Sequence, residues 1–256
     1  MTWQEMKEFL DEKHDLYNNP AFIEKDPVSI PHSYEKLQDR EISGFLTATI
    51  SWGRRDLILR GAGKLMEKMG ESPHEYIINA SDDDFERYSD FVYRTFSGVD
   101  CISFLHSLRG IYRSFQSMED IIADGMKADG ELTSGIAHWR SMFFKPMHPS
   151  RSEKHFADIR NGAAGKRLNM FLRWMVRSDN RGVDFGLWKR ISPSQLYLPL
   201  DFHSGNMSRM LGLLKRKAND WKAVEEVTAL LRQFDHLDPV KYDFALFGLG
   251  VNEDFR

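Results

Sequence analysis

The stretch LYLPLDFHSGNMSRMLGL, residues 196–213, joins an apolar, proline-broken segment to the start of a helix. Asp201 follows Pro199-Leu200 and directly precedes the helical pattern, so it is predicted at or near the N-cap. His203 follows two residues later. The pattern leaves two explanations open. Asp201 is either a structural cap alone, or a carboxylate that the helix start holds in place for chemistry.

A second segment, NGAAGKRLNMFLRWMVR at 161–177, places a glycine turn before an apolar helix. Gly162 and Gly165 permit a tight reversal that β-carbons would obstruct, and Lys166 stands where the helix begins. The preceding residues 152–160 predict another helix, so the region reads as helix, hairpin, helix. A phosphate-binding P-loop is excluded, because Arg167 stands where Ser or Thr should hold magnesium and no strand precedes it.

The rest of the chain has the periodicity of helices. Apolar residues recur at three- and four-residue intervals in most segments, and Gly, Pro, Asn and Asp clusters separate them. Only QLYLPL, at 195–200, has the alternation of a strand. Asp238-Pro239 predicts the start of the last helix, with proline at its first position. The sequence therefore predicts an all-α fold of ten or more short helices.

Composition limits the class of protein. Of 256 residues, 41% are hydrophobic and 29% charged, which is ordinary for a globular chain. No run of about 18 apolar residues exists, so no membrane span is expected. The single cysteine, Cys101, excludes an internal disulfide and a cysteine-bound iron–sulfur cluster. The first 15 residues read as an amphipathic helix and not as a signal peptide, so we expect a cytoplasmic protein.

Charge is distributed unevenly along the chain. The formal net charge is −3, yet residues 160–217 hold twelve Lys or Arg and three Asp or Glu. Clustered cations neutralise phosphates and release counterions, which favours a polyanion such as DNA as partner. A basic face that is merely solvated is the alternative.

Taken together, these segments resemble the helix-hairpin-helix (HhH-GPD) DNA glycosylase superfamily. That superfamily has a Gly-x-Gly-x-Lys hairpin and, downstream, a Pro-Val-Asp-Thr-His loop before a helix ending Arg-x-Leu-Gly-Leu. GAAGKRLNMFL and PLDFHSGNMSRMLGL are similar to these two motifs. ISGFLTATISWGRRDLILRGAGKLM, from Ile42, looks like the family's early helix pair, and YDFALFGLGV, from Tyr242, looks like its closing helix.

The sequence also departs from the family pattern. Ala164 replaces the middle glycine of the hairpin, and Gly53 stands where many members carry a DNA-probing glutamine. Lys166 and Asp201 are 35 residues apart, about twice the common spacing, so residues 177–195 read as an insertion. This longer spacing is most similar to that of archaeal 8-oxoguanine DNA glycosylases, which points to an oxidised purine as the lesion.

The resemblance implies an organisation, a function and a partner. It implies one HhH-GPD-like unit over 1–256, made of two helical subdomains with a cleft between them. Residues 40–145 would form a helical bundle, and 1–39 with 146–256 the catalytic subdomain that contains the hairpin. The implied function is base-excision repair by a DNA glycosylase with AP-lyase activity. We expect it to act as a monomer on nucleoid DNA, with no membrane partner.

The resemblance also implies roles for individual residues. Lys166 would be the nucleophile that forms a Schiff base, and Asp201 the carboxylate that stabilises positive charge on the sugar. Other residues are expected to contact the DNA. Those expected to bind its phosphates are Gly162, Gly165, Arg167, His203, Arg209 and Arg54. Those expected to line a pocket for an everted base are Trp188, Phe202 and Trp52. No His and carboxylate spacing typical of a metal enzyme is present. A monovalent cation bound by hairpin carbonyls is the one cofactor that the resemblance allows.

Two alternatives remain at this point. The substitutions at Ala164 and Gly53 are also compatible with a DNA-binding protein that kept the scaffold and lost the chemistry. The second alternative is a helical protein unrelated to the glycosylases, in which Asp201 is only a helix cap.

Overall fold

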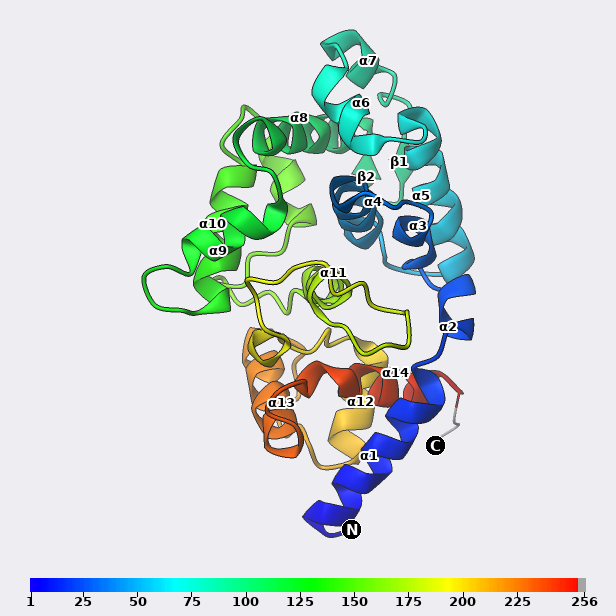
Figure 1. The fold of residues 1–256 in the computed structure, drawn as a ribbon, viewed down its shortest axis with the longest axis vertical. Helices are drawn as coiled ribbons and strands as arrows, with labels where there is room; N and C mark the ends of the chain where they lie inside the picture. The colour runs from blue at the N-terminus through cyan, green and yellow to red at the C-terminus, as the bar shows by residue number, and fades with distance from the viewer. Residues whose placement is uncertain (253–256) are drawn as a thin grey trace. The chain divides into compact units, whose positions relative to one another are not determined.

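The computed structural model describes residues 1–252, and these are mostly helical (Figure 1). Within that range the strands are limited to one two-stranded sheet. The predicted all-α class is therefore confirmed. The chain divides into two compact units. The terminal unit contains residues 1–24 and the chain from Ile159 onward, and the central unit contains residues 25–158.

The terminal unit is built around its last helix. Its elements are α1 (Trp3–Tyr17), α2 (Ala21–Glu24), α11 (Lys166–Val176), α12 (Phe202–Met210), α13 (Trp221–Phe234) and α14 (Tyr242–Asn252), with 3-10 turns at Pro193–Gln195 and Pro239–Lys241. Helix α14 packs against both α1 and α12 (Figure 1). Two glycines permit this approach. A Cβ at Gly248 would overlap the Tyr17 ring, and one at Gly250 would lie 3.0 Å from the Cβ of His203.

The central unit packs its helices around buried aromatic rings. Its elements are α3 (Ser29–His32), α4 (Leu37–Thr49), α5 (Arg55–Met69), α6 (Pro73–Asn79), α7 (Asp82–Glu86), β1 (Val92–Tyr93), β2 (Phe96–Ser97), α8 (Gly98–Ser114), α9 (Met118–Gly125), α10 (Leu132–Phe143) and a 3-10 helix at Ser150–His155. Phe45 of α4 lies 5.2 Å from Trp139 and 5.4 Å from Phe143, measured between ring centroids. Such tilted and edge-on pairs add to the free energy of burying apolar area.

A buried carboxylate ties α4 to the turn between α8 and α9. Glu41 is fully buried and accepts hydrogen bonds from the Tyr112 hydroxyl at 2.7 Å and the Met118 amide at 3.2 Å. The Ser117 hydroxyl donates a third. A buried charge is tolerated only where such donors replace water, so Glu41 specifies how this turn meets α4.

The structure differs from the sequence-based prediction at several elements. Before the hairpin, the predicted helix is wrong, since Ser150–His155 is a short 3-10 helix and 156–165 contains no helix. Tertiary hydrogen bonds hold this segment, because the Ser152 hydroxyl donates to Asp100 Oδ1 at 2.8 Å and the Arg140 guanidinium to the Phe156 carbonyl at 3.3 Å.

Other differences concern helix starts and strands. Helix α14 begins at Tyr242, and the predicted start at Pro239 is a 3-10 turn. The hairpin that pairs Val92 with Ser97 was not predicted, and QLYLPL is no strand. The boundaries of the units lie at 24/25 and 158/159, whereas the sequence placed subdomain boundaries at 39/40 and 145/146.

Replacing Glu41 with alanine tests the packing of α4. We expect Glu41→Ala to lower the free energy of unfolding by about 3 kcal/mol, because three buried donors lose their acceptor. Glu41→Gln, which keeps one carbonyl oxygen, should cost less. Urea unfolding monitored by circular dichroism measures both. The exposed Glu35→Ala is the matched control and should stay within about 0.5 kcal/mol of wild type. A Glu41→Ala variant as stable as this control would contradict the role given to Glu41.

Candidate active site

The first side chain of α11 is Lys166, and a glycine turn places it there. Gly165 is the N-cap and has a φ of 63°, a left-handed conformation that favours glycine. A Cβ at Gly165 would also lie 3.2 Å from Ile159 Cγ2. The carbonyl of Gly162 accepts the Trp221 amide at 3.0 Å, which anchors the turn to the start of α13.

One face of α11 carries Lys166, Met170 and Arg173, which are four and then three residues apart. The Lys166 amine is half-buried and lies 3.6 Å from the sulfur of Met170. Within residues 1–252 it makes no ion pair. The amine is thus held at a helix start without a carboxylate partner in direct contact.

The carboxylate of Asp201 caps α12 with only one of its oxygens. Oδ1 accepts hydrogen bonds from the Ser204 amide at 2.9 Å and the Ser204 hydroxyl at 3.1 Å. The predicted N-cap is therefore confirmed. Oδ2 accepts no hydrogen bond from the part of the chain that the structure describes, and the residue is half-buried. One carboxylate oxygen of Asp201 therefore caps the helix, and the other is not engaged by the described residues.

Asn169 connects the glycine turn with the segment that leads to Asp201. Its side-chain amide donates to the Ala164 carbonyl at 3.4 Å and to the Leu198 carbonyl at 3.5 Å. Asn169 is 1% exposed. The backbone amide of Leu198 in turn donates to the Thr228 hydroxyl of α13 at 3.1 Å. These contacts hold the chain three residues before Asp201 against the first turns of α11.

A buried network of ion pairs holds the other end of α11. The Arg173 guanidinium donates to Asp243 on α14 and, at 3.2 Å, to Asp184. Arg177 donates to Asp184 at 3.1 Å and to Asp238 at 2.8 Å. The Asp184 side chain is fully buried, so this network secures the apparent insertion 177–195 to α11.

The backbone of the same segment also pairs with α11. The Phe185 amide donates to the Trp174 carbonyl at 2.8 Å, and the Trp188 amide to the Met175 carbonyl at 3.0 Å. The segment is thus part of the packed structure and not a loose addition to it.

Asp243 brings the two proposed catalytic residues into one electrostatic environment. Burial raises the pKa of Asp243 to about 6, although the Arg173 charge opposes this shift. The charge of Asp201 also raises the pKa of Asp243, and the charge of Lys166 lowers it. Lys166 and Asp201, far apart in sequence, are therefore both near enough to Asp243 for their charges to influence its pKa.

The aromatic residues proposed for a base pocket differ in exposure. Phe202, the first residue of α12, is 70% exposed and lies beside Asp201. Trp188 is 1% exposed, and its ring packs edge-on against Phe171 with centroids 5.5 Å apart. Trp188 is a core residue in this structure, because packing against α11 covers it, and it presents no open face to a base.

Two proposed phosphate ligands have structural contacts of their own. The Arg209 guanidinium donates to the Arg216 carbonyl at 2.8 Å and to Asn219 Oδ1 at 2.6 Å, which holds the loop between α12 and α13. The exposed His203 ring meets the Gly250 carbonyl at 3.1 Å through Nδ1. Arg167 is half-buried, and desolvation lowers the pKa of its guanidinium to about 10.

Arg54 and Trp52 belong to the central unit. Arg54 is exposed and donates to both carboxylate oxygens of Asp56, at 3.0 and 2.9 Å. Trp52 is half-buried and its carbonyl accepts the Tyr93 hydroxyl at 2.8 Å. Between them Gly53 has a φ of 98°, and a Cβ there would overlap the Arg94 guanidinium.

The basic region at 160–217 carries less free charge than its composition indicates. Several of its cations pair with carboxylates inside the terminal unit, among them Arg173, Arg177, Arg181 and Arg216. Arg160, Lys215 and Lys217 are exposed. The charge count from the sequence therefore overestimates the basic surface, because ion pairs with residues outside 160–217 cannot be read from that window.

Sequence reasoning missed four residues that organise this site: Asn169, Arg173, Asp184 and Asp243. The signal was present for Asn169 and Arg173, which interrupt the apolar run NMFLRWMV, since a polar residue on a buried helix face needs a partner. No comparable signal marks which aspartate is the partner.

Within residues 1–252, no group of three or more His, Cys, Asp or Glu side chains could hold a metal ion. None of the described helices has both the length and the hydropathy needed to span a membrane.

Comparison with known proteins places the chain in a family. A family model described as "Protein of unknown function (DUF2400)" matches residues 26–252. The match covers most of the chain, so the protein belongs to this family. Neither the curated proteins nor the solved structures gave a match.

The raised pKa of Asp243 predicts a pH-dependent contribution to stability. A carboxyl whose pKa is about 6 in the folded state, against 3.8 ordinarily, stabilises the fold at low pH and loses that contribution as pH rises through 6. The free energy of unfolding of wild type, relative to Asp243→Asn, should therefore fall by roughly 2 kcal/mol between pH 4 and 7. Urea unfolding of both proteins across this range gives the difference. A flat difference, or one that grows with pH, would contradict the assignment.

Proposed function

We propose that this DUF2400 protein is a DNA glycosylase with AP-lyase activity, which removes a damaged base through a Schiff base on Lys166. One arrangement carries the proposal. Within residues 1–252 the Lys166 amine makes no ion pair and Asp201 Oδ2 accepts no hydrogen bond, and both residues lie close enough to the buried Asp243 for their charges to shift its pKa. The family resemblance of the two motifs gives these groups their roles, and an oxidised purine is the lesion that their spacing favours.

Asp201 would stabilise the charge that develops as the base leaves. Breaking the N-glycosidic bond moves its electron pair to the base and leaves positive charge on C1′ and the ring oxygen. A fixed carboxylate oxygen near that charge lowers the barrier electrostatically. Oδ2 of Asp201 suits this role, because Oδ1 already serves the amide and hydroxyl of Ser204 and so fixes the direction of the carboxylate.

Lys166 would supply the electron pair that forms the new bond. Its neutral amine attacks C1′, the bond from C1′ to the base breaks, and the sugar ring opens as the amine nitrogen and C1′ form a Schiff base. Loss of a proton from C2′ then expels the 3′ phosphate and cuts the strand. The amine has to be deprotonated to act, and in the structure it lies 3.6 Å from the sulfur of Met170, a weak hydrogen-bond acceptor.

DNA would be held by the same glycine turn. The first amides of α11 are without helical partners, and a helix N-terminus favours a phosphate. Gly162 at the beginning of this turn is exposed, and Gly165 at its end is buried. The carbonyls of the turn retain lone pairs with which to hold a monovalent cation. Phe202 offers an exposed ring beside Asp201 on which an everted base could stack.

Borohydride trapping tests this function. With duplex DNA containing 8-oxoguanine and a panel of other lesions, wild type should give a covalent adduct after reduction. Lys166→Gln should abolish the adduct, because no amine remains to form the Schiff base. Lys217→Gln, at an exposed lysine of the same basic region, is the matched control and should keep it. Absence of adduct and of base release from every lesion would overturn the proposal.

The role of Asp201 is separated from its capping by the choice of substitute. Asparagine caps a helix about as well as aspartate, so Asp201→Asn should keep the melting temperature while slowing base release by about 100-fold or more. Asp201→Ala should lose both, with a cost of about 1 kcal/mol in stability. Single-turnover assays and thermal unfolding measure the two effects. If the wild type binds duplexes in a salt-dependent way without releasing a base, the protein is a non-catalytic DNA-binding member on this scaffold.

A further inference from the structure

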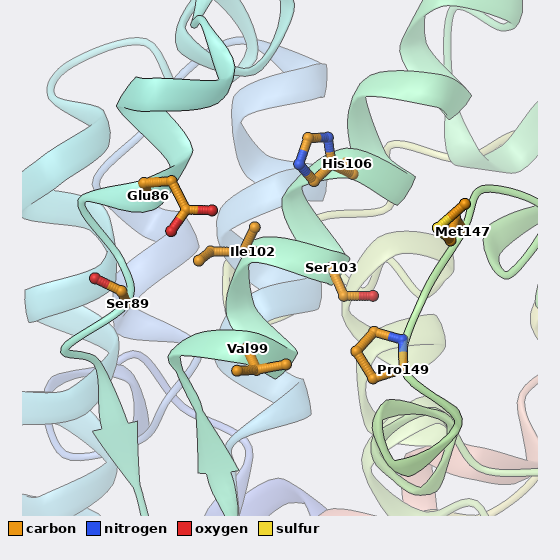
Figure 2. A pocket seen from close by; sticks show the side chains of 8 residues that line it. All are labelled: Glu86, Ser89, Val99, Ile102, Ser103, His106, Met147 and Pro149. Atoms are coloured by element: carbon orange, nitrogen blue, oxygen red, sulfur yellow. The ribbon is translucent and has the colours of Figure 1, made fainter.

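The central unit contains a cavity that has no part in the proposed chemistry. It measures about 270 Å³ and is lined by Val99, Ile102, Ser103 and His106 of α8, by Glu86 and Ser89, and by Met147 and Pro149 (Figure 2). Pockets for drug-sized ligands and cofactors usually measure about 300–1,000 Å³. The cavity is thus closer in size to one or two amino-acid side chains.

Apolar side chains on its rim are open to solvent. Val99 is 51% exposed and Met147 is 97% exposed; in Figure 2 Val99 lies below Ile102, and Met147 lies to the right, beyond Ser103. Exposed apolar residues around a hollow are typical of surfaces that bind a partner. An apolar group that entered the cavity would cover them.

Ser103 places an unused polar group in the same cavity. It is 6% exposed, and its hydroxyl makes no hydrogen bond with any residue in the range 1–252. A buried hydroxyl without a partner destabilises the fold, because it has lost its hydrogen bonds to water. A ligand that offers it an acceptor removes this cost and so binds more tightly. Figure 2 shows this hydroxyl directed toward the side of the cavity formed by Pro149. A main-chain carbonyl of a bound segment is a suitable acceptor.

The other polar groups of the cavity favour a cation. Glu86 is exposed and makes no ion pair within residues 1–252. Across the cavity, His106 accepts a hydrogen bond from Arg109 at Nδ1, at 2.9 Å, so its proton is on Nε2. Burial, and then the charge of Arg109, lower the pKa of His106, so this ring adds no positive charge at neutral pH.

The surrounding surface has the same sign as Glu86. Helix α7 carries Asp82, Asp83 and Asp84 next to Glu86. Arg109 pairs with Asp82 at 2.5 Å, and Arg87 with Asp84 at 3.1 Å. Asp83, like Glu86, makes no ion pair within the described chain. The unpaired carboxylates of this rim favour a cationic partner over phosphate.

We propose that this cavity docks a segment of a partner protein that presents one apolar side chain beside Lys or Arg. The apolar side chain enters between Val99, Ile102 and Pro149. The neighbouring cation pairs with Glu86, and a main-chain carbonyl of the segment accepts the Ser103 hydroxyl. This docking surface is independent of the proposed glycosylase activity.

Synthetic peptides test the proposal with the full chain. The probes are acetyl-Gly-X-Leu-X-Gly-amides in which X is Lys, Gln or Glu, and methyl NMR signals of Val99, Ile102 and Met147 report binding. The Lys peptide should bind about fivefold more tightly than the Gln peptide, as an exposed ion pair allows, and the Glu peptide most weakly. Replacing the central Leu with Ser should abolish the shifts, and Ser103→Ala should weaken binding of the Lys peptide.

Charge reversal makes the test specific to the cavity. Glu86→Lys should invert the preference, so that the Glu peptide binds best, whereas Asp83→Lys, the matched control outside the cavity, should leave the order unchanged. Equal binding of the three peptides, inversion by Asp83→Lys, or no shift at about 10 mM peptide would each overturn the proposal. So would butylammonium binding as tightly as the Lys peptide, since a free amine would then satisfy the site without a protein segment.

Discussion

Arg173 lies two helical turns after Lys166 on the same face of α11, and its ion pair with Asp243 joins that face to the first turn of α14. Both side chains are buried, so neither charge can return to water without breaking the packing of the two helices. Asp184 and Arg177 extend the pair into a network that fixes residues 177–195. The position of the Lys166 amine therefore depends on this network, although the amine makes no ion pair within the described chain.

The same geometry is compatible with both roles given to Asp201, the helix cap and the proposed catalytic carboxylate. Asp201 caps the first turn of α12 with Oδ1, and that interaction restrains the carboxylate, while Oδ2 accepts no hydrogen bond from residues 1–252. Asn169 adds a second restraint, because it holds Leu198 near the start of α11. A cap and a preorganised carboxylate are thus compatible readings of Asp201. The proposed chemistry requires Lys166 near Oδ2, and the charges of Lys166 and Asp201 both shift the pKa of Asp243.

Local rules predicted the helical class, the N-cap at Asp201 and the glycine turn before Lys166, because each depends on residues close together in sequence. The helix expected before the turn is absent, since Asp100 and Arg140 hold that segment by tertiary hydrogen bonds. Trp188 was expected at a base pocket and is core, because residues 177–195 fold back on α11. The pairing of Arg173 with Asp243 spans 70 residues, a separation that helical periodicity does not encode.

The most direct measurement is the pKa of Asp243, followed through its side-chain carboxyl ¹³C shift in wild type and two variants. If Lys166 and Asp201 act on one carboxyl, Lys166→Gln should raise the pKa of Asp243, because a positive charge is lost. Asp201→Asn should lower it, because a negative charge is lost. An Asp243 pKa that neither substitution moves would show that the two groups do not share a site, and would contradict the account.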